Sequence, residues 1–369
     1  MIPDKALYQI ALTQITGVGV MHARNLLKVI GDEEAIFKER SGVLEAIPRI
    51  SQRLIREIRS PEVLRRAEKE LDFVVRNNLR LLFFNDPEYP QRLLLCIDAP
   101  ILLYAKGNGD FNREKSISIV GTRDATRQGK EFCKTWVKEL AERIPDLQIV
   151  SGLAYGIDIA AHEAALQNGL STVAVLAHGL DRIYPQVHRQ TAVAMLQNGA
   201  LLTEFPSGTN PDRHNFVKRN RIVAGMADAV VVVESAEKGG SLITADIANS
   251  YFREVFAVPG RTNDKRSSGC NMLISENKAI LLQNVASFIV HMGWETAAPQ
   301  KTPVQKELFP NLSDEEKEIV NALEHNGTMH VNTLSIELNT PLSELFMTLL
   351  ELEMKHIVES IPGGMYKMV

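Results

Sequence analysis

A basic segment at residues 213–221 surrounds one aromatic side chain, and it is the part of the sequence best suited to hold a ligand. The segment reads Arg-His-Asn-Phe-Val-Lys-Arg-Asn-Arg, and no Asp or Glu occurs between Arg213 and Ala227. Cationic side chains attract phosphate groups at short range, and the ring of Phe216 offers a face on which a base can stack. The same composition fits a helix whose cations form internal ion pairs while Phe216 fills the core, so this segment alone leaves both interpretations open.

Glycine-containing turns follow three of the expected strands and supply further groups that could hold an anion. Gly121 is followed two residues later by Arg123. Ser151 and Gly152 begin a Ser-Gly-Leu-Ala-Tyr-Gly-Ile-Asp run, and a Gly-Gly-Ser run spans residues 239–241. Each turn places backbone N–H groups at the start of a helix, where they can meet an anion. A tight strand-to-helix connection explains any one of them, but three together with Arg123 and the basic segment predict an anion-binding crevice.

Other polar residues that invite a catalytic interpretation fit structural roles better. Asp158 and His162 are four residues apart and share a helix face. However, a carboxylate in the first helical turn favours the helix dipole, and one Asp with one His is at most half of a metal site. His178 and the Tyr184-Pro185 pair are expected to shape loops. The sequence contains no Walker A, GxSxG or HExxH motif, and we therefore predict a protein without catalytic residues, metal or cofactor.

The overall composition limits the classes of function. The chain has 369 residues, 45% of them hydrophobic, which suffices for two or three domains with real cores. A net charge of −4 argues against a protein that coats nucleic acid over its whole surface, so any such binding must use a local patch. The three cysteines form no metal-binding pattern, and the N-terminus shows neither a secretion signal nor a long apolar run. The composition favours a soluble protein of the reducing cytoplasm.

An α/β core of about residues 80–290 has to position these groups. Short β-branched runs alternate there with helical patterns, which is typical of a parallel sheet covered by helices on both faces. We expect six strands at residues 116–120, 148–150, 172–176, 201–203, 229–233 and 255–258, preceded by two more at 79–84 and 101–104. The pattern predicts an extended Rossmann-like sheet, in which ligands bind beyond the carboxyl ends of the strands.

Residues 1–75 predict a helical domain of the helix-hairpin-helix type. Gly17 and Gly19 would allow a tight turn, and apolar residues at helical spacing follow. Backbone N–H groups at this turn could hold a phosphate, or the turn could serve packing alone. A degenerate second copy at residues 47–51 has Arg and Ser in place of the glycines and is expected to be structural.

A linker and a small C-terminal domain complete the chain. Residues 291–312 contain Gly, several Pro and no periodicity, which is typical of a linker. Residues 313–369 begin with a Ser-Asp-Glu-Glu capping box, continue as three short helices and end in a hairpin with a Pro-Gly-Gly turn. This order predicts a winged helix. Because its third helix carries Glu344, Glu351 and Glu353, we expect it to face a partner protein and not DNA.

An ordered set of motifs in the core resembles one known family. The motifs lie at residues 118–123, 151–158 with 161–162, 216–225, 239–244 and 258–260, and they follow shorter ones at 89–90, 99–100 and 103–104. In this order they resemble the DNA-processing protein A (DprA/Smf) family. The resemblance covers roughly residues 80–285 and predicts that the chain is a member.

The resemblance implies a single-stranded DNA-binding protein that is not an enzyme. Members protect DNA that enters competent bacteria in natural transformation, and they load the recombinase RecA onto it. The family's DNA pocket corresponds to Arg123, Arg213 and Phe216, although the family often has Lys where this chain has Arg213. The residues that resemble the family's Arg-Asn-Arg motif are Lys218, Arg219, Asn220 and Arg221, and some of these are expected to brace the pocket instead of touching DNA.

The resemblance also implies a homodimer. Family members dimerise through the later part of the core, where Met272, Leu273, Ile274 and Leu281 supply apolar surface. Ordinary core packing is the alternative role of these residues.

A small-nucleotide hydrolase of the cytokinin-activating type is the main alternative function, because it shares a Rossmann-like core. Its signature is Pro-Gly-Gly-x-Gly-Thr-x-x-Glu. Residues 238–246 read Lys-Gly-Gly-Ser-Leu-Ile-Thr-Ala-Asp, which lacks the Gly-Thr pair and has Asp in place of Glu. A nucleotide-hydrolysis assay beside a DNA-binding assay separates the two functions.

Overall fold

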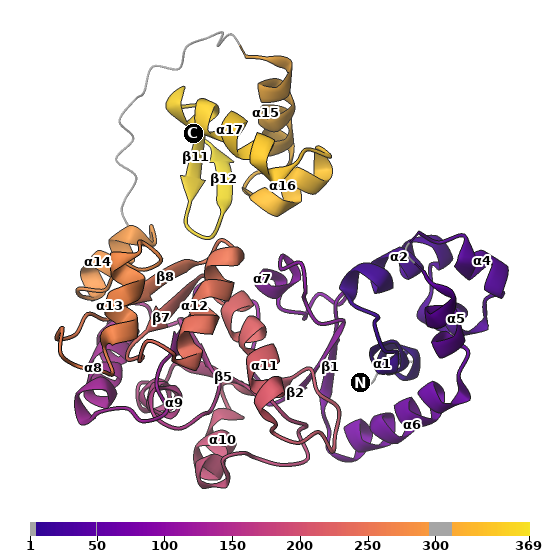
Figure 1. Cartoon of the computed structure of the whole chain (residues 1–369), viewed down its shortest axis with the longest axis horizontal. Helices are drawn as coiled ribbons and strands as arrows, with labels where there is room; N and C mark the ends of the chain where they lie inside the picture. The colour runs from indigo at the N-terminus through magenta and orange to yellow at the C-terminus, as the bar shows by residue number, and fades with distance from the viewer. Residues whose placement is uncertain (1–4, 49, 295–311) are drawn as a thin grey trace.

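The computed structural model describes residues 5–48, 50–294 and 312–369. A helical N-terminal part, an α/β core and a small C-terminal part follow one another along the chain (Figure 1). Most of the predicted linker, together with Arg49 of the degenerate second copy, lies outside the described residues. Within the described ranges, no helix combines the length and the apolar character that a membrane crossing requires.

A nine-stranded, mostly parallel sheet forms the centre of the molecule. Its spatial order is β1-β2-β6-β5-β4-β3-β7-β8-β9. The strands are β1 (Arg80–Phe83), β2 (Leu102–Lys106), β3 (Ser116–Val120), β4 (Gln148–Ser151), β5 (Ser171–Val175), β6 (Ala200–Thr203), β7 (Ala229–Val232), β8 (Glu254–Ala257) and β9 (Ile280–Leu281). In this spatial order, every neighbouring pair from β6 across β3 to β9 is parallel. The pairs β1–β2 and β2–β6 are antiparallel. The predicted fold class, an extended Rossmann-like core, is confirmed.

The order of the strands reverses at β3. The chain first adds β4, β5 and β6 on one side of β3, and then adds β7, β8 and β9 on the other side. In doubly wound sheets a crevice opens beyond the carboxyl ends of the strands at such a switch point. The fold therefore gathers the turns after β3 and β4 and the loop after β7 around one crevice.

Helices cover both faces of the sheet. They are α7 (Gln91–Leu94), α8 (Arg127–Arg143), α9 (Ile157–Gln167), η1 (Gln186–His188), α10 (Arg189–Met195), α11 (Arg213–Gly225), α12 (Gly240–Ser250), α13 (Ser268–Ser275) and α14 (Val285–His291). Helices α8 and α9 pack together over one face, where they share a core with Ile117 and Phe256. Helices α11 and α12 pack together over the other face, against Val150 and Val230. Because both faces are covered, every residue of β3 to β7 is buried, and these strands show no apolar–polar alternation.

Six helices form the N-terminal part over the described residues 5–48 and 50–76. They are α1 (Ala6–Gln14), α2 (Val20–Ile30), α3 (Glu33–Lys38), α4 (Ser41–Glu45), α5 (Gln52–Ile58) and α6 (Pro61–Arg76). Gly17 has a φ of +90°, the left-handed conformation that the predicted tight turn before α2 requires. Apolar residues of these helices, such as Ile10 and Leu26, share one core with Leu82 and Leu103 of β1 and β2. The N-terminal part is therefore packed onto the antiparallel edge of the sheet.

The C-terminal part has an apolar core of its own, centred on residues such as Leu323, Leu345 and Leu349. Its elements are α15 (Asp314–Asn326), β10 (Met329–His330), α16 (Val331–Glu337), α17 (Leu342–Met354), β11 (Val358–Ile361) and β12 (Met365–Met368). The capping box forms as expected, because Ser313 Oγ accepts a hydrogen bond from the Glu316 N–H (3.2 Å) and Glu316 Oε2 accepts one from the Ser313 N–H (2.9 Å). The three helices and the sheet β10-β12-β11 form the predicted winged helix.

Candidate nucleic-acid interface

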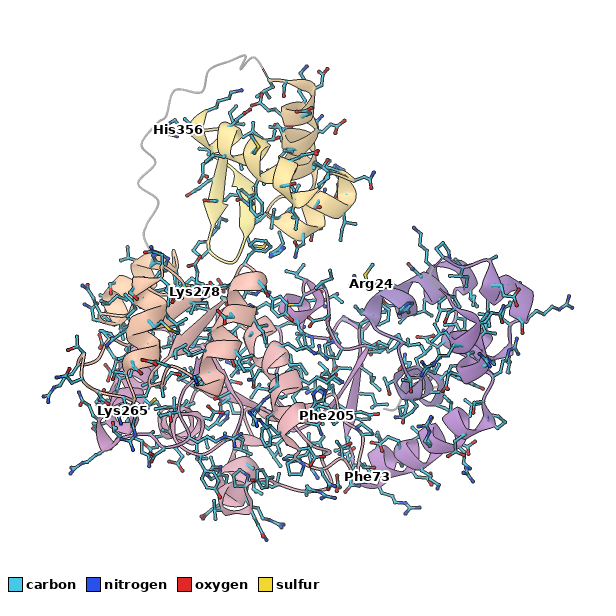
Figure 2. The ribbon with its side chains drawn as sticks, in the orientation of Figure 1. Arg24, Phe73, Phe205, Lys265, Lys278 and His356 are labelled. Atoms are coloured by element: carbon cyan, nitrogen blue, oxygen red, sulfur yellow. The ribbon has the colours of Figure 1, made fainter. Side chains whose placement is uncertain are left out.

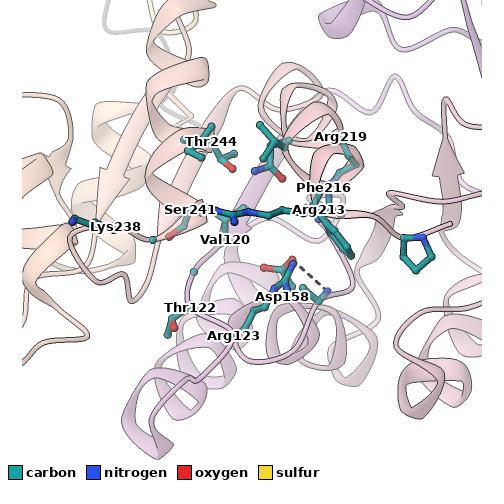
Figure 3. Close-up of a pocket in the computed structure, with 18 of the residues that line it drawn as sticks. Val120, Thr122, Arg123, Asp158, Arg213, Phe216, Arg219, Lys238, Ser241 and Thr244 are labelled. Atoms are coloured by element: carbon teal, nitrogen blue, oxygen red, sulfur yellow. Dashed lines mark hydrogen bonds between the residues drawn. The ribbon is translucent and has the colours of Figure 1, made fainter.

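A cavity of about 700 Å³ lies at the switch point of the sheet, next to the carboxyl end of β3 and between α11 and α12 (Figure 3). The β3–α8 turn, the start of α9, the loop before η1, α11 and the start of α12 all contribute to its lining. The charged residues among the lining are Arg123, Arg213, Arg219 and Lys238, which are cationic, and Asp158. The cavity occupies the place where the sequence predicted an anion-binding crevice.

Aromatic and guanidinium planes meet inside this cavity. The guanidinium carbon of Arg123 lies 4.7 Å from the centroid of the Phe216 ring, a distance at which a cation attracts the ring face. The ring of Tyr184 lies 6.1 Å from that of Phe216. Phe216 is half-buried, whereas Tyr184 is 43% exposed. The cavity therefore offers flat surfaces on which a planar base can stack.

Three of the cations are available to a ligand. Arg123, Arg213 and Lys238 are exposed, and no carboxylate among the described residues forms an ion pair with them. Arg213 opens α11, and Lys238 precedes the Gly-Gly-Ser run at which α12 begins. The N-terminus of α12 adds the partial positive charge of its helix dipole. This distribution of charge favours an anionic ligand.

Arg219 holds two loops together at the bottom of the cavity. Its Nη1 donates hydrogen bonds to the carbonyl oxygens of Gly152 (2.8 Å) and Val175. A Cβ at residue 152 would lie 2.2 Å from the same nitrogen, so the close approach requires glycine. Burial lowers the pKa of Arg219 to about 10, which leaves the guanidinium protonated at neutral pH. Arg219 thus places a fixed positive charge next to the cavity.

Asp158 and His162 make contacts that support the loop after β4 and the neighbouring sheet. Asp158 Oδ2 accepts hydrogen bonds from the N–H groups of Gly152 (3.2 Å) and Ala154 (3.4 Å). Burial raises the pKa of the Asp158 carboxyl, while the charge of Arg219 acts in the opposite direction. His162 is fully buried, with Nδ1 2.7 Å from Oγ1 of Thr172. In the part of the chain that the structure describes, no group of three or more His, Cys, Asp or Glu could hold a metal ion.

Lys218 and Arg221 point away from the cavity. Lys218 Nζ lies 3.1 Å from Glu204 Oε2, and Arg221 Nη2 contacts the same carboxylate oxygen. Glu204 directly follows β6 and lies in the loop that leads from β6 to α11. On α11 the lining residues recur at helical spacing, whereas Lys218 and Arg221 lie on another face. The four residues of the Arg-Asn-Arg region therefore divide, because Arg219 and Asn220 line the cavity and the other two do not.

The other expected site residues also separate into lining and support. Gly121 lines the cavity, and a Cβ there would lie 2.5 Å from Cγ1 of Ile157. Ser151 is fully buried, and its Oγ donates to the carbonyl oxygen of Ile119 (2.6 Å). Ser151 therefore links β4 to β3 and does not reach the cavity.

Tyr184 and Lys238 line the cavity but were not among the site residues expected from the sequence. The Gly-Gly-Ser run beside Lys238 carried a usable signal, since it marks a helix start that can meet an anion. Tyr184 carried no such signal. In the sequence it fits a role in loop architecture, and only the folded path of its loop brings it to Phe216.

The fold and the cavity define the class of this protein: a doubly wound α/β protein with a cationic, aromatic-lined cavity at the switch point of its sheet. The chain belongs to the DNA recombination-mediator protein A (DprA/Smf) family. The model of that family matches residues 80–293, and a model of the DprA winged helix domain matches residues 299–364. The family predicted from the motifs is confirmed.

Relatives of known name extend over most of the chain. Protein Smf of Escherichia coli is 34% identical over 315 residues, which are 80% of this chain and 79% of that protein. The DNA processing protein DprA of Streptococcus pneumoniae is 40% identical over 196 residues, which are 53% of this chain and 68% of that protein.

Two solved structures of family members are similar to this one. The DprA structure from Streptococcus pneumoniae has a TM-score of 0.63 at 31% identity and covers 77% of this chain and 97% of that one. A structure of DNA processing protein A from Helicobacter pylori, which concerns its single-stranded DNA binding mode, has a TM-score of 0.52 at 30% identity. It covers 57% of this chain and 94% of that one.

Proposed function

We propose that this protein binds single-stranded DNA, protects DNA that enters the cytoplasm during natural transformation, and loads RecA onto it. The observation that carries the proposal is the cavity in which Phe216 and Tyr184 lie beside cations that form no ion pair within the described part of the chain. Membership in the DNA recombination-mediator protein A family supports it. So does the Helicobacter pylori relative, whose structure concerns single-stranded DNA binding.

The proposed binding mode assigns a role to each group in the cavity. One unpaired base stacks on Phe216, while the flanking phosphates contact Arg123 and Arg213. Lys238 and the N-terminus of α12 bind a further phosphate. A duplex hides its base faces within the stack, so this mode favours single strands.

A comparison of DNA substrates tests the proposal. Fluorescence anisotropy with a labelled oligonucleotide is expected to show tighter binding of the single strand than of the matching duplex. The double variant Arg123→Ala/Arg213→Ala should lose affinity for the single strand and keep its thermal stability. Arg143→Ala is the matched control, because this exposed arginine lies at the opposite end of α8 and should have no effect. A folded double variant with the affinity of the parent would contradict the proposal.

We further propose that the protein forms a homodimer through the edge of the sheet at β9. Leu281 is 41% exposed there, and Met272 and Ile274 are partly buried beside the core. Leu273, in contrast, is 1% exposed and supports the surface from inside. The test is sedimentation velocity at micromolar concentration, where a monomer would contradict the proposal.

We propose binding without catalysis. The nucleotide hydrolase that shares a Rossmann-like core is not favoured, because residues 238–246 lack its signature and the chain belongs to a different family. Incubation with nucleoside monophosphates should therefore give no hydrolysis above a blank.

A further inference from the structure

An aromatic residue in an unusual backbone conformation joins the core to the winged helix. Phe252, just after α12, has a φ of +57°, which is uncommon for a bulky side chain. Its ring lies 5.5 Å from that of Phe346 in α17 and 6.2 Å from that of His330. The turn between β11 and β12 approaches so closely that a Cβ at Gly364 would lie 2.8 Å from the Cβ of Phe252. The winged helix is therefore docked on the core through the residues around Phe252.

The polar part of this contact is poorly satisfied. Asn332 Nδ2 donates to the carbonyl oxygen of Leu95 at 3.4 Å, which is long for a hydrogen bond. His330 Nε2 and Arg253 Nε are buried, and within the described residues neither has a hydrogen-bond partner. Burial, with a smaller effect from the charge of Arg253, lowers the pKa of His330 to about 4. Unpaired buried groups weaken a contact, which favours opening of the docked arrangement.

The docked hairpin β11–β12, which we call the wing, faces the open edge of the sheet. A cavity of about 860 Å³ lies between them, with Ile274, Ile280 and Leu281 on the core side and Ile361 and Tyr366 on the wing side. Figure 2 shows the labelled Lys278, from the same edge, on the side of the core that faces the winged helix. Among the residues that the structure describes, β9 is the last strand of the sheet and pairs only with β8. The wing therefore stands over the unpaired edge of β9.

We propose that the wing and a second copy of this chain compete for the β9 edge. An open strand edge with exposed apolar side chains can pair with its own copy about a two-fold axis. The docked wing stands in the space that the second copy would need, so self-association requires the winged helix to move away. The proposal rests on the homodimer proposed above and adds a gate to it.

The gate has a definite effect on the concentration at which dimers form. Both copies must open before they can pair. The apparent dissociation constant therefore rises by the factor (1 + K)², where K is the ratio of closed to open protein. A closed-to-open ratio of only about 3 weakens the dimer roughly 16-fold. Loss of the docking contact should therefore strengthen self-association at least tenfold.

Two full-length variants open the gate from opposite sides. Phe252→Asn removes the aromatic contact and keeps the backbone, because Asn tolerates a positive φ. Gly364→Asn is compatible with the φ of +69° at that position, but its Cβ would push Phe252 away. Met347→Gln is the matched control, since this residue is 68% exposed on α17 and does not line the cavity.

Two measurements decide the outcome. Small-angle scattering at low concentration reports the opening as a larger radius of gyration, and sedimentation velocity reports the dissociation constant. We expect both Asn variants to expand and to dimerise at least tenfold more tightly than the parent, and we expect added Leu281→Lys to abolish that dimer. If the variants expand but dimerise no more tightly than the parent, the gate is wrong and the homodimer stands. The same conclusion follows if the variants do not expand. If no protein self-associates, with or without Leu281→Lys, the homodimer itself is wrong and the gate falls with it.

Discussion

The side chain of Phe216 combines two environments that the sequence could not separate. It projects from a helix that packs on the sheet, yet it is only half-buried and lines the cavity. The neighbouring Arg123 and Tyr184 keep one part of the ring surrounded by polar or exposed groups. The ring is therefore held in place by the protein while part of it remains open to a ligand.

Replacement of Phe216 by Leu is expected to weaken single-stranded DNA binding by about 1–3 kcal/mol. Leu keeps an apolar side chain at this position of α11 but removes the aromatic face, so thermal stability should change little. Fluorescence anisotropy measures the affinity, and Phe216→Tyr serves as the control that restores the ring. Equal affinity of the Leu variant and the parent would mean that no base stacks at this position.

Burial of His162 makes the stability of the protein depend on pH. Burial, assisted by the charge of Arg219, lowers the pKa of His162 to about 3 from an ordinary value of about 6.5. The unfolded chain therefore binds a proton below pH 6.5 that the folded protein does not bind until about pH 3. Stability contributed by neutral His162 is present above pH 6.5 and is lost as the pH falls, by roughly 2 kcal/mol between pH 6.5 and 5.

Urea unfolding of the parent and of His162→Asn at both pH values isolates this contribution. Asn retains a polar group near Oγ1 of Thr172 but does not titrate, so the parent should lose more stability on acidification than the variant. Parallel losses in the two proteins would show that His162 does not cause the pH dependence.

At the residue scale, the sequence predicted which charged residues lie near the site better than it predicted which way their side chains point. Arg123, Arg213 and Phe216 could be grouped because their motifs resemble one family. The absence of acidic residues between Arg213 and Ala227 suggested that the cations of α11 are free, but Glu204, from the loop before the helix, pairs with Lys218 and Arg221. Such pairing depends on how the loop between β6 and α11 turns back toward the helix, and the pattern within α11 contains no information on that.

Helix α11 illustrates how one element serves both binding and stability. Its cavity face carries Arg213, Phe216 and Asn220, whereas Lys218 and Arg221 reach Glu204, whose side chain is 8% exposed. A nearly buried carboxylate is stable only when cations or hydrogen bonds compensate it. The two faces should therefore respond to substitution in opposite ways.

Arg221→Ala is expected to lower the free energy of unfolding by about 1–3 kcal/mol, because Glu204 loses a buried partner. DNA affinity should stay within a few-fold of the parent. Arg213→Ala is the matched comparison on the same helix and should show the reverse, with weaker DNA binding at unchanged stability. Urea unfolding and anisotropy on both variants test the assignment, and a large loss of DNA affinity in Arg221→Ala would contradict it.

The elements themselves were largely predictable, because buried parallel strands produce apolar runs and helices produce periodic patterns. All eight expected strands are present. Strand β9 was missed because its two residues, Ile280–Leu281, are too short to show any pattern. The antiparallel pairing of β1 and β2 was not expected either, since strand direction follows from the path of the chain and not from the composition of the run.

Across the whole molecule, the cavity and the winged helix are built from separate stretches of chain. Residues 120–244 provide the entire lining of the cavity, and the winged helix has its own apolar core. Its contacts with the core lie around Phe252, outside that lining. The acidic residues of α17 give it little attraction for phosphate.

A protein truncated after Trp294 is therefore expected to bind single-stranded DNA within a few-fold of the full chain. This end point keeps α14 and the packing of Trp294 against Phe288, whose rings are 5.6 Å apart. The competing view is that Lys355 and Lys367 of the winged helix hold a phosphate and strengthen binding through linked sites. A loss of more than about tenfold in affinity, or roughly 1.4 kcal/mol, would favour that view.

The burial of Arg219 has a consequence for how the cavity behaves in different ionic strengths. Salt screens exposed charges over a Debye length of about 10 Å at 0.1 M, but it screens buried charges much less. Arg123, Arg213 and Lys238 are open to this screening, whereas the residue Arg219 is 4% exposed and its guanidinium donates to two carbonyl oxygens. As salt rises, the attraction from the exposed cations fades first. The field of Arg219 and the stacking surface of Phe216 persist, so the cavity retains a salt-resistant part of its affinity.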